Sequence, residues 1–211
     1  MTRAALRTPL CALCLALLAG CGSSPPVHHY ALARPEAGGP VSGSARVLVE
    51  ILPVAVPEGL VRSNLVLTDG QGWVSVLESE RWLAPIADDL RQIVADGLWR
   101  TAWAADSYQA PVPGPSTALP QYRLALRLDR FDAFSGWTAT VAGSWTLRRL
   151  PNGPVHGCRW EGRQPVDGPD VAAAATALSD ASRRLAGRIG DSLRRALAAQ
   201  ADVCPEEDES R

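Results

Sequence analysis

Five cysteines carry the thiol chemistry that this chain of 211 residues could perform: Cys11, Cys14, Cys21, Cys158 and Cys204. The first two have the C-x-x-C spacing of a zinc or redox site. They lie, however, in an apolar run, Leu10 to Ala19, that follows Arg3 and Arg7. A basic start, a short apolar core and small residues at its end are typical of a secretory signal peptide. Residues 1–20 are therefore predicted to be removed, and the C-x-x-C pair goes with them.

Cys21 ends the sequence Leu18-Ala19-Gly20-Cys21, which is similar to the bacterial lipobox. In proteins with that motif the cysteine sulfur receives a diacylglycerol, and cleavage leaves the acylated cysteine as the N-terminus. The alternative is an ordinary secreted protein in which Cys21 is buried. The motif favours lipidation, so we expect Cys21 to be a lipid anchor bearing fatty acyl chains such as palmitate.

The residues after Cys21 predict where the anchor places the protein. An aspartate at position 22 would indicate retention in the inner membrane of a Gram-negative cell, but Gly22 stands there. The lipobox resemblance therefore implies export to the outer membrane, with the protein facing the periplasm. Residues 21–27 contain Ser23, Ser24 and two prolines and read as a short acylated tether.

Cys158 and Cys204 remain in the mature chain, and an oxidising periplasm makes them candidates for a disulfide. The alternative is two separate thiols, buried or exposed. On the chain-entropy description, closing a loop of this length stabilises the folded state by about 4–5 kcal/mol. We expect the bridge, because the chain after the last helix could return to the strand that contains Cys158.

Other reactive side chains do not assemble into a recognisable catalytic, metal or cofactor motif. His28 and His29 are adjacent, so on a strand they point to opposite faces, and His156 is distant in sequence. Asp129 and Asp132 could form a carboxylate pair, but charged residues near a solvated turn explain them better. The mature chain has 19 arginines against 22 acidic residues and no basic block, which argues against a nucleic-acid partner. We expect no catalytic residues, no metal and no cofactor.

Alternating apolar residues predict the strands that would position these groups. The clearest are in YRLALRLDRF, WTATVAGSWTL and VHGCRWEGR, joined by Ser135-Gly136 and Asn152-Gly153 into an antiparallel meander with one buried face. Short strands are expected in HHYALA, RVLVEIL, NLVL and WVSVLE. Residues 28–204 are thus predicted to form a single α/β domain, and residues 205–211 an acidic, disordered tail.

Helical spacing replaces alternation in two segments. The first helix should begin at about Leu83 to Pro85, with Asp88, Asp89 and Arg91 facing water. The second should begin at about Val171, capped by Asp167 or Asp170, with i,i+4 ion pairs from Asp180 to Arg184 and from Asp191 to Arg195. The expected fold is an α/β (α+β) sandwich: a mixed, largely antiparallel sheet with two main helices packed on it.

The chain has seven tryptophans against two phenylalanines. Trp137 and Trp145 alternate with small polar residues and are predicted to pack in the core. Trp99 and Trp103 share one face at the end of the first helix, beside a proline-rich loop. We take that pair as a candidate partner interface, because exposed aromatic residues suit protein contacts.

Several segments in order resemble one family. After the lipobox come YAL at 30–32, VAVPEGLVR at 54–62, ESERWLAPI at 78–86, YRLALRLDRFDA at 122–133 and an alanine-rich C-terminal helix. The chain resembles the PqiC/YmbA type of ABC-transport auxiliary lipoproteins, which are associated with MCE (mammalian-cell-entry) systems. The resemblance implies an α/β sandwich and a docking role in lipid transport between two membranes.

The first functional hypothesis is therefore a non-enzymatic outer-membrane lipoprotein that docks an MCE-domain protein of an ABC lipid transport system. This hypothesis includes the option that identical copies close into a homo-oligomeric ring. The alternative is a stand-alone periplasmic carrier or chaperone for a lipid or lipoprotein, which requires its own apolar cavity of several hundred Å³. A third hypothesis, a cell-envelope enzyme, has no motif in its favour.

Overall fold

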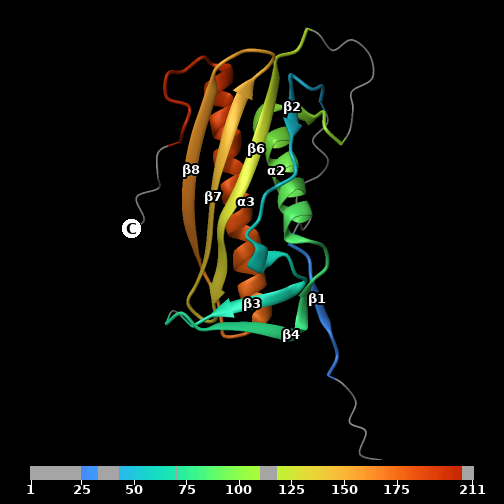
Figure 1. The fold of residues 1–211 in the computed structure, drawn as a ribbon, viewed down its shortest axis with the longest axis vertical. Helices are drawn as coiled ribbons and strands as arrows, with labels where there is room; N and C mark the ends of the chain where they lie inside the picture. The colour runs from blue at the N-terminus through green and yellow to red at the C-terminus, as the bar shows by residue number, and fades with distance from the viewer. Residues whose placement is uncertain (1–24, 33–42, 70, 110–117, 206–211) are drawn as a thin grey trace, which may run out of the picture.

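The computed structural model describes residues 25–32, 43–69, 71–109 and 118–205. Within these residues the elements are β1 (His28–Tyr30), β2 (Val47–Ile51), the 3-10 helix η1 (Glu58–Leu60), β3 (Asn64–Thr68), β4 (Val74–Trp82), α2 (Ile86–Ala102), β5 (Ala104–Asp106), β6 (Gln121–Phe134), β7 (Thr138–Arg149), β8 (Val155–Pro165) and α3 (Val171–Leu197). The strands form one mixed sheet with both helices packed on it (Figure 1). This confirms the predicted α+β fold. The predicted signal peptide, Cys21 and the predicted tail at residues 206–211 lie outside the described residues.

Strand β6 is the centre of the sheet. One of its edges pairs with β7 along almost its whole length, and β7 pairs with β8, which makes the predicted antiparallel meander. The other edge is shared: β2 runs parallel to the first part of β6, and β3 runs parallel to its last residues. The short strands β5, β4 and β1 continue the sheet outward from β2 and β3. The long ladders are antiparallel and the short additions are mostly parallel.

A bulge in β6 changes which side chains are buried. From Tyr122 to Leu128 every second residue is buried, as the alternation predicts. The register to β7 then shifts between Leu128 and Arg130. Since one extra residue reverses the alternation, Phe131 and Ala133 are buried and Phe134 is only half-buried.

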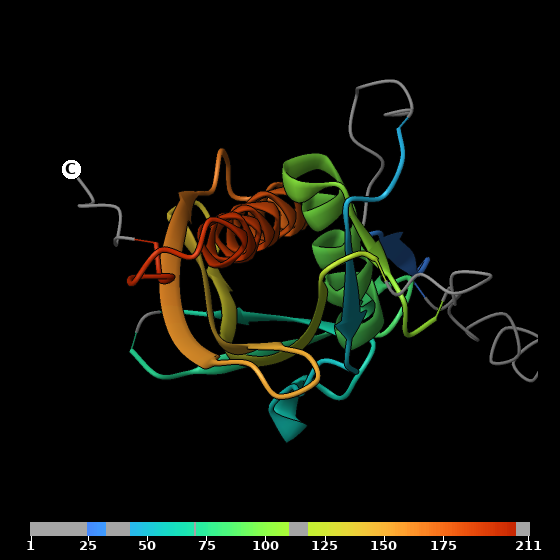
Figure 2. The same cartoon turned by 90° about the horizontal axis from the view of Figure 1, so that it is seen from above.

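The helices cover one face of the sheet and contact each other (Figure 2). α3 begins at Val171 as predicted, and the Asp170 carboxylate caps it by accepting a hydrogen bond of 2.7 Å from the Ala173 amide. α2 begins at Ile86, one residue later than expected, with Pro85 at its N-cap. Gly97 allows the helices to approach, because a Cβ there would lie 3.0 Å from the Cβ of Ala186 on α3.

The predictions for Trp137 and for the ion pairs of α3 are wrong. Trp137 is 68 % exposed, whereas Trp145 is buried as predicted. Trp137 lies in the β6–β7 turn before the strand begins, so it does not follow the alternation, and its ring packs on Phe134 with centroids 5.2 Å apart. The ion pairs of α3 also differ: Asp180 pairs with Arg183 and Asp191 with Arg194, both at i,i+3.

Candidate functional site

The two ends of the sheet are defined by strand register. At one end Thr68 pairs with both Val74 and Phe134, and Phe134 pairs with Thr138. At the other end Leu48 pairs with Ala105 and Gln121. Figure 1 shows the first group at the lower end of the molecule, where β1 also begins and the chain arrives from residue 25. We call this the anchor end and the opposite one the far end.

Strand β1 ties the incoming chain to the sheet. The Tyr30 hydroxyl donates a hydrogen bond of 2.7 Å to Glu80 on β4, and the same carboxylate contacts His28 Nδ1 at 2.9 Å. The hydrogen bonds from His28 and Tyr30 lower the pKa of Glu80. Burial, followed by the hydrogen bond to the Glu80 carboxylate, raises the pKa of Tyr30 to about 12. Both shifts favour a neutral Tyr30 bound to an ionised Glu80.

Trp99 and Trp103 lie at the far end, where α2 leads into β5. Their rings are in edge contact, with centroids 5.5 Å apart, and both side chains are half-buried. Trp103 has a left-handed backbone, with φ of 53°, and the Arg46 guanidinium lies 5.9 Å from its ring centroid. The predicted pair is thus packed together, with part of its surface open to solvent.

An open depression of about 720 Å³ lies at the same end. It is lined by residues 118–121 and by four residues around the end of β7, Arg148, Arg149, Leu150 and Pro151, together with Arg123. Arg148 and Arg149 are exposed, while Arg123 pairs with Glu50 at 2.6 Å. The far end therefore combines apolar side chains with cationic ones, which suits a partner carrying carboxylates beside apolar groups.

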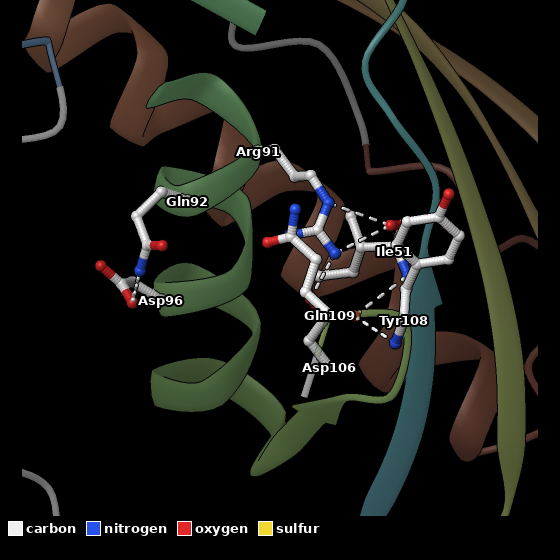
Figure 3. Close-up of polar contacts among 7 residues, drawn as sticks. All are labelled: Ile51, Arg91, Gln92, Asp96, Asp106, Tyr108 and Gln109. Atoms are coloured by element: carbon white, nitrogen blue, oxygen red, sulfur yellow. Dashed lines mark hydrogen bonds and ion pairs between the residues drawn. The ribbon is translucent and has the colours of Figure 1, made fainter. Parts of the chain in front are cut away.

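Arg91 is buried, which corrects the prediction that it faces water. Figure 3 shows its guanidinium aimed from α2 at the end of β2 and at β5. It donates to the carbonyl of Ile51 at 3.0 and 3.1 Å and to Gln109 Oε1 at 2.7 Å, and it forms an ion pair with Asp106. The Tyr108 ring lies 5.6 Å from the guanidinium carbon. Every donor group has a partner, so this cluster fastens α2 to the sheet.

Asp89, also predicted to face water, is half-buried, and its carboxylate accepts a hydrogen bond of 3.2 Å from the Leu32 amide. The sequence gives only a weak signal that Arg91 and Asp89 are buried. Helical spacing places both residues beside the apolar stripe, but it does not show what that edge of the helix packs against. A polar residue at the border of a stripe becomes buried only if the neighbouring strand supplies partners.

The two carboxylates considered as a pair, Asp129 and Asp132, each accept a hydrogen bond from a neighbouring arginine. Asp129 accepts from Arg127 at 2.8 Å, and Asp132 accepts from Arg130 at 2.6 Å, so the two carboxylates do not form an acid–base pair. The hydrogen bond that Arg130 donates to the Asp132 carboxylate raises the pKa of Arg130. In the described part of the chain, no group of three or more metal-binding side chains is close enough to hold an ion.

Side chains fill the space between helices and sheet. Leu178, Leu185 and Ile189 on α3 are at most 1 % exposed, and they pack in one core with Trp145 and Trp160 of the sheet. A pocket between α3 and β3 measures about 10 Å³, too small for a lipid chain. A depression of about 650 Å³ on the β6–β7–β8 strands is open to solvent and is lined partly by Arg127 and Arg159.

Cys158 on β8 and Cys204 after α3 are joined by a disulfide, with an S–S distance of 2.08 Å and Cα atoms 5.4 Å apart. Arg195 donates a hydrogen bond of 3.2 Å to the Cys204 carbonyl, and the neighbouring Val203 is buried. The segment after α3 is thereby held on β8. The described residues include no helix with the length and apolar character needed to cross a bilayer.

A family model described as "ABC-type transport auxiliary lipoprotein component" matches residues 30–190. The chain belongs to this family. The match begins at Tyr30 and spans the rest of the sheet and most of α3. It includes the residues named above at both ends of the domain, except His28 and the segment with Cys204. The auxiliary lipoproteins are components of transport systems and are not a family of enzymes.

Two solved structures share this fold, and a third is more distantly similar. The crystal structure of an uncharacterized protein has a TM-score of 0.64 and 15 % identity, covering 80 % of this chain and 99 % of its own. A protein from Xanthomonas campestris has a TM-score of 0.58 and 18 % identity, covering 77 % and 92 %. A PelC dodecamer from Paraburkholderia phytofirmans has a TM-score of 0.38 and 12 % identity, covering 72 % and 93 %. The search of curated proteins found no match.

Proposed function

We propose that this auxiliary lipoprotein is held at the periplasmic face of the outer membrane by an acylated Cys21 and docks an MCE-domain protein of an ABC lipid transport system. The observation that carries the proposal is that the point where the chain enters the domain and the candidate docking residues lie at opposite ends of the sheet. The chain enters at the anchor end, and the half-exposed tryptophans and exposed arginines lie at the far end. A domain anchored in this way presents its far end to a partner that reaches across the periplasm.

The short tether makes this orientation effective. Four residue steps separate Cys21 from Pro25, and an extended chain covers at most about 14 Å in that length. The domain is therefore kept close to the bilayer, at a high effective concentration for a partner that reaches it. Identical copies closing into a ring would surround the end of such a partner, since cyclic symmetry suits a conduit.

The docking surface is assigned to Trp99, Trp103 and the depression beside Arg148 and Arg149. An arginine pair next to apolar residues recognises carboxylates presented beside apolar side chains. We expect the mature protein to co-purify with its MCE-domain partner, and Arg148→Glu/Arg149→Glu to weaken that binding at least tenfold. The matched control is Arg163→Glu on β8 near the anchor end, where the side chain is 69 % exposed. Equal binding by the Arg148/Arg149 variant and the wild type would remove the far end as the docking surface.

The anchor is tested separately by Cys21→Ala, which should leave the protein unprocessed or release it from the outer-membrane fraction. Mass spectrometry of the wild-type N-terminal peptide should show acyl chains on Cys21. An unmodified cysteine together with normal fractionation of the variant would contradict the anchoring.

The carrier alternative predicts a stoichiometric phospholipid bound to the purified protein without any partner. The filled space between helices and sheet argues against it, because a carrier shields an acyl chain from water inside an apolar cavity. Lipid extraction followed by quantification decides between the two: one phospholipid per chain, retained when MCE binding is absent, would favour the carrier.

A further inference from the structure

Trp73 and Trp137 are the two most exposed aromatic side chains in the described part of the molecule, at 75 % and 68 %. They belong to different turns. Trp73 follows the β3–β4 turn, and Trp137 lies between β6 and β7. Val74, beside Trp73, is also 59 % exposed. Large apolar side chains at turns are costly in water, so their gathering at one end of a fold indicates a surface that contacts something.

The sheet register places both tryptophans at the anchor end. Val74 pairs with Thr68, Thr68 with Phe134, and Phe134 with Thr138. Three strand spacings therefore separate the residues next to Trp73 and Trp137, a distance of about 15 Å. In Figure 1 the β3–β4 hairpin lies across the lower end of the molecule, and the β6–β7 turn lies at that same end.

The path of the chain before β1 indicates which structure lies next to the surface that carries Trp73 and Trp137. Residues 25–27 lead into β1 from the lower end, and Cys21 stands four residues earlier. If Cys21 is acylated, as the proposed function requires, the bilayer lies within about 14 Å of Pro25. The end of the domain that carries the exposed tryptophans then lies on the bilayer side, opposite the far end.

We propose that Trp73, Trp137 and Val74 form a second membrane contact, with the indole rings seated among the lipid headgroups. Tryptophan suits that position because its ring is apolar while its N–H remains able to donate to water or to a headgroup. Together with the acylated tether, two separated indoles make three points of attachment. Three points fix the tilt of the domain, which a flexible tether alone leaves free.

The two turns also indicate which lipids are involved. Neither turn, residues 69–73 or residues 135–137, contains a basic side chain. Asp69 is occupied within its own turn, where it accepts hydrogen bonds from the amides of Gln71 and Trp73 at 2.9 and 3.1 Å. The contact therefore rests on apolar insertion, and we expect it to form on zwitterionic phospholipid and to be insensitive to salt.

The test uses the mature, acylated protein in phosphatidylethanolamine/phosphatidylcholine vesicles whose acyl chains carry bromine near the headgroup. Bromine quenches tryptophan fluorescence only at short range. We expect clear quenching of the wild type in low and high salt, and loss of most of it in Trp73→Ser/Trp137→Ser. The control is Val155→Ser, which removes an exposed apolar side chain (59 %) at the far end of β8 and should leave quenching unchanged.

Equal quenching in the double variant and the wild type would overturn the proposal, because the affected tryptophans would then be others. The proposal would also be overturned if the wild type showed no quenching and the double variant dissociated an oligomer that the wild type forms. The surface would then join two copies of the chain. Acylation of Cys21 is read independently from the mass of the N-terminal peptide. A failed anchor and a failed tryptophan contact are therefore distinguishable. Unchanged thermal unfolding shows that the variants remain folded.

Discussion

The Tyr30 hydroxyl and the Glu80 carboxylate lie 2.7 Å apart and join the first strand of the domain to β4. β1 has three residues and pairs with β4, and this hydrogen bond and the His28 contact add two side-chain links to that short backbone ladder. If Cys21 is acylated as proposed, any force that this anchor exerts on the domain enters through β1, because residues 25–27 lead directly into that strand.

Acid should loosen β1. Folding lowers the pKa of Glu80 from its ordinary value of 4.5, so the unfolded state binds the proton more tightly. The contribution of Glu80 to stability is complete above pH 4.5 and is lost as the pH falls through the lowered pKa. Hydrogen exchange of residues 28–31 should accelerate over that range. In Glu80→Gln the exchange should be faster at neutral pH and should lose this acid dependence; an unchanged pH profile would contradict the role of Glu80.

Replacing Arg91 should destabilise the fold strongly. Arg91→Met leaves the Asp106 carboxylate without its buried partner, and breaking such a pair costs about 3–5 kcal/mol. The free energy of unfolding in denaturant measures the effect. Gln92→Ala on the exposed face of the same helix is the control and should change stability by less than about 1 kcal/mol. Similar effects from the two variants would show that Arg91 does not fasten α2 to the sheet.

Reduction should weaken the attachment of the C-terminal segment. Cys158 and Cys204 are 46 residues apart, and on the chain-entropy description a loop of that length stabilises the folded state by about 4 kcal/mol. The double variant Cys158→Ser/Cys204→Ser should unfold at lower denaturant, and reductant should affect the wild type but not the variant. Rapid thiol labelling of both cysteines without reductant would show that they are not bridged.

Shortening a side chain that packs between α3 and the sheet should reveal how tightly the interior is packed. Leu185 is fully buried in the core, and Leu185→Ala should cost about 3–5 kcal/mol because a well-packed site cannot collapse around the cavity. Val155→Ala, at an exposed position, should have little effect. If Leu185→Ala cost as little as Val155→Ala, the interior would be loose enough for a ligand, and the carrier hypothesis would regain support.

The local elements were predictable because their signals are local. The alternation of Tyr122, Leu124 and Leu126 required a half-buried strand, and the position of Asp170 before an apolar stripe marked the start of α3. The ordered motifs after the lipobox likewise predicted the family, which the match over residues 30–190 confirms. The strand and helix signals depend on residues that are close in sequence, and the family signal depends on the order of short motifs along the chain.

The side chains that matter most for the proposed contacts were decided by tertiary structure. Trp137 is exposed because it lies in the turn between β6 and β7, although simple alternation places it inside. Arg91 is buried because β2 and β5, which are distant in sequence, bring the Ile51 carbonyl and Asp106 to it. The sequence alone determined the strand and helix types and marked Cys21 as the predicted anchor. Only the parallel pairing of β3 with β6 placed Trp73 and Trp137 at the same end of the sheet, where the chain enters, because a pairing between distant strands is set by how whole elements pack.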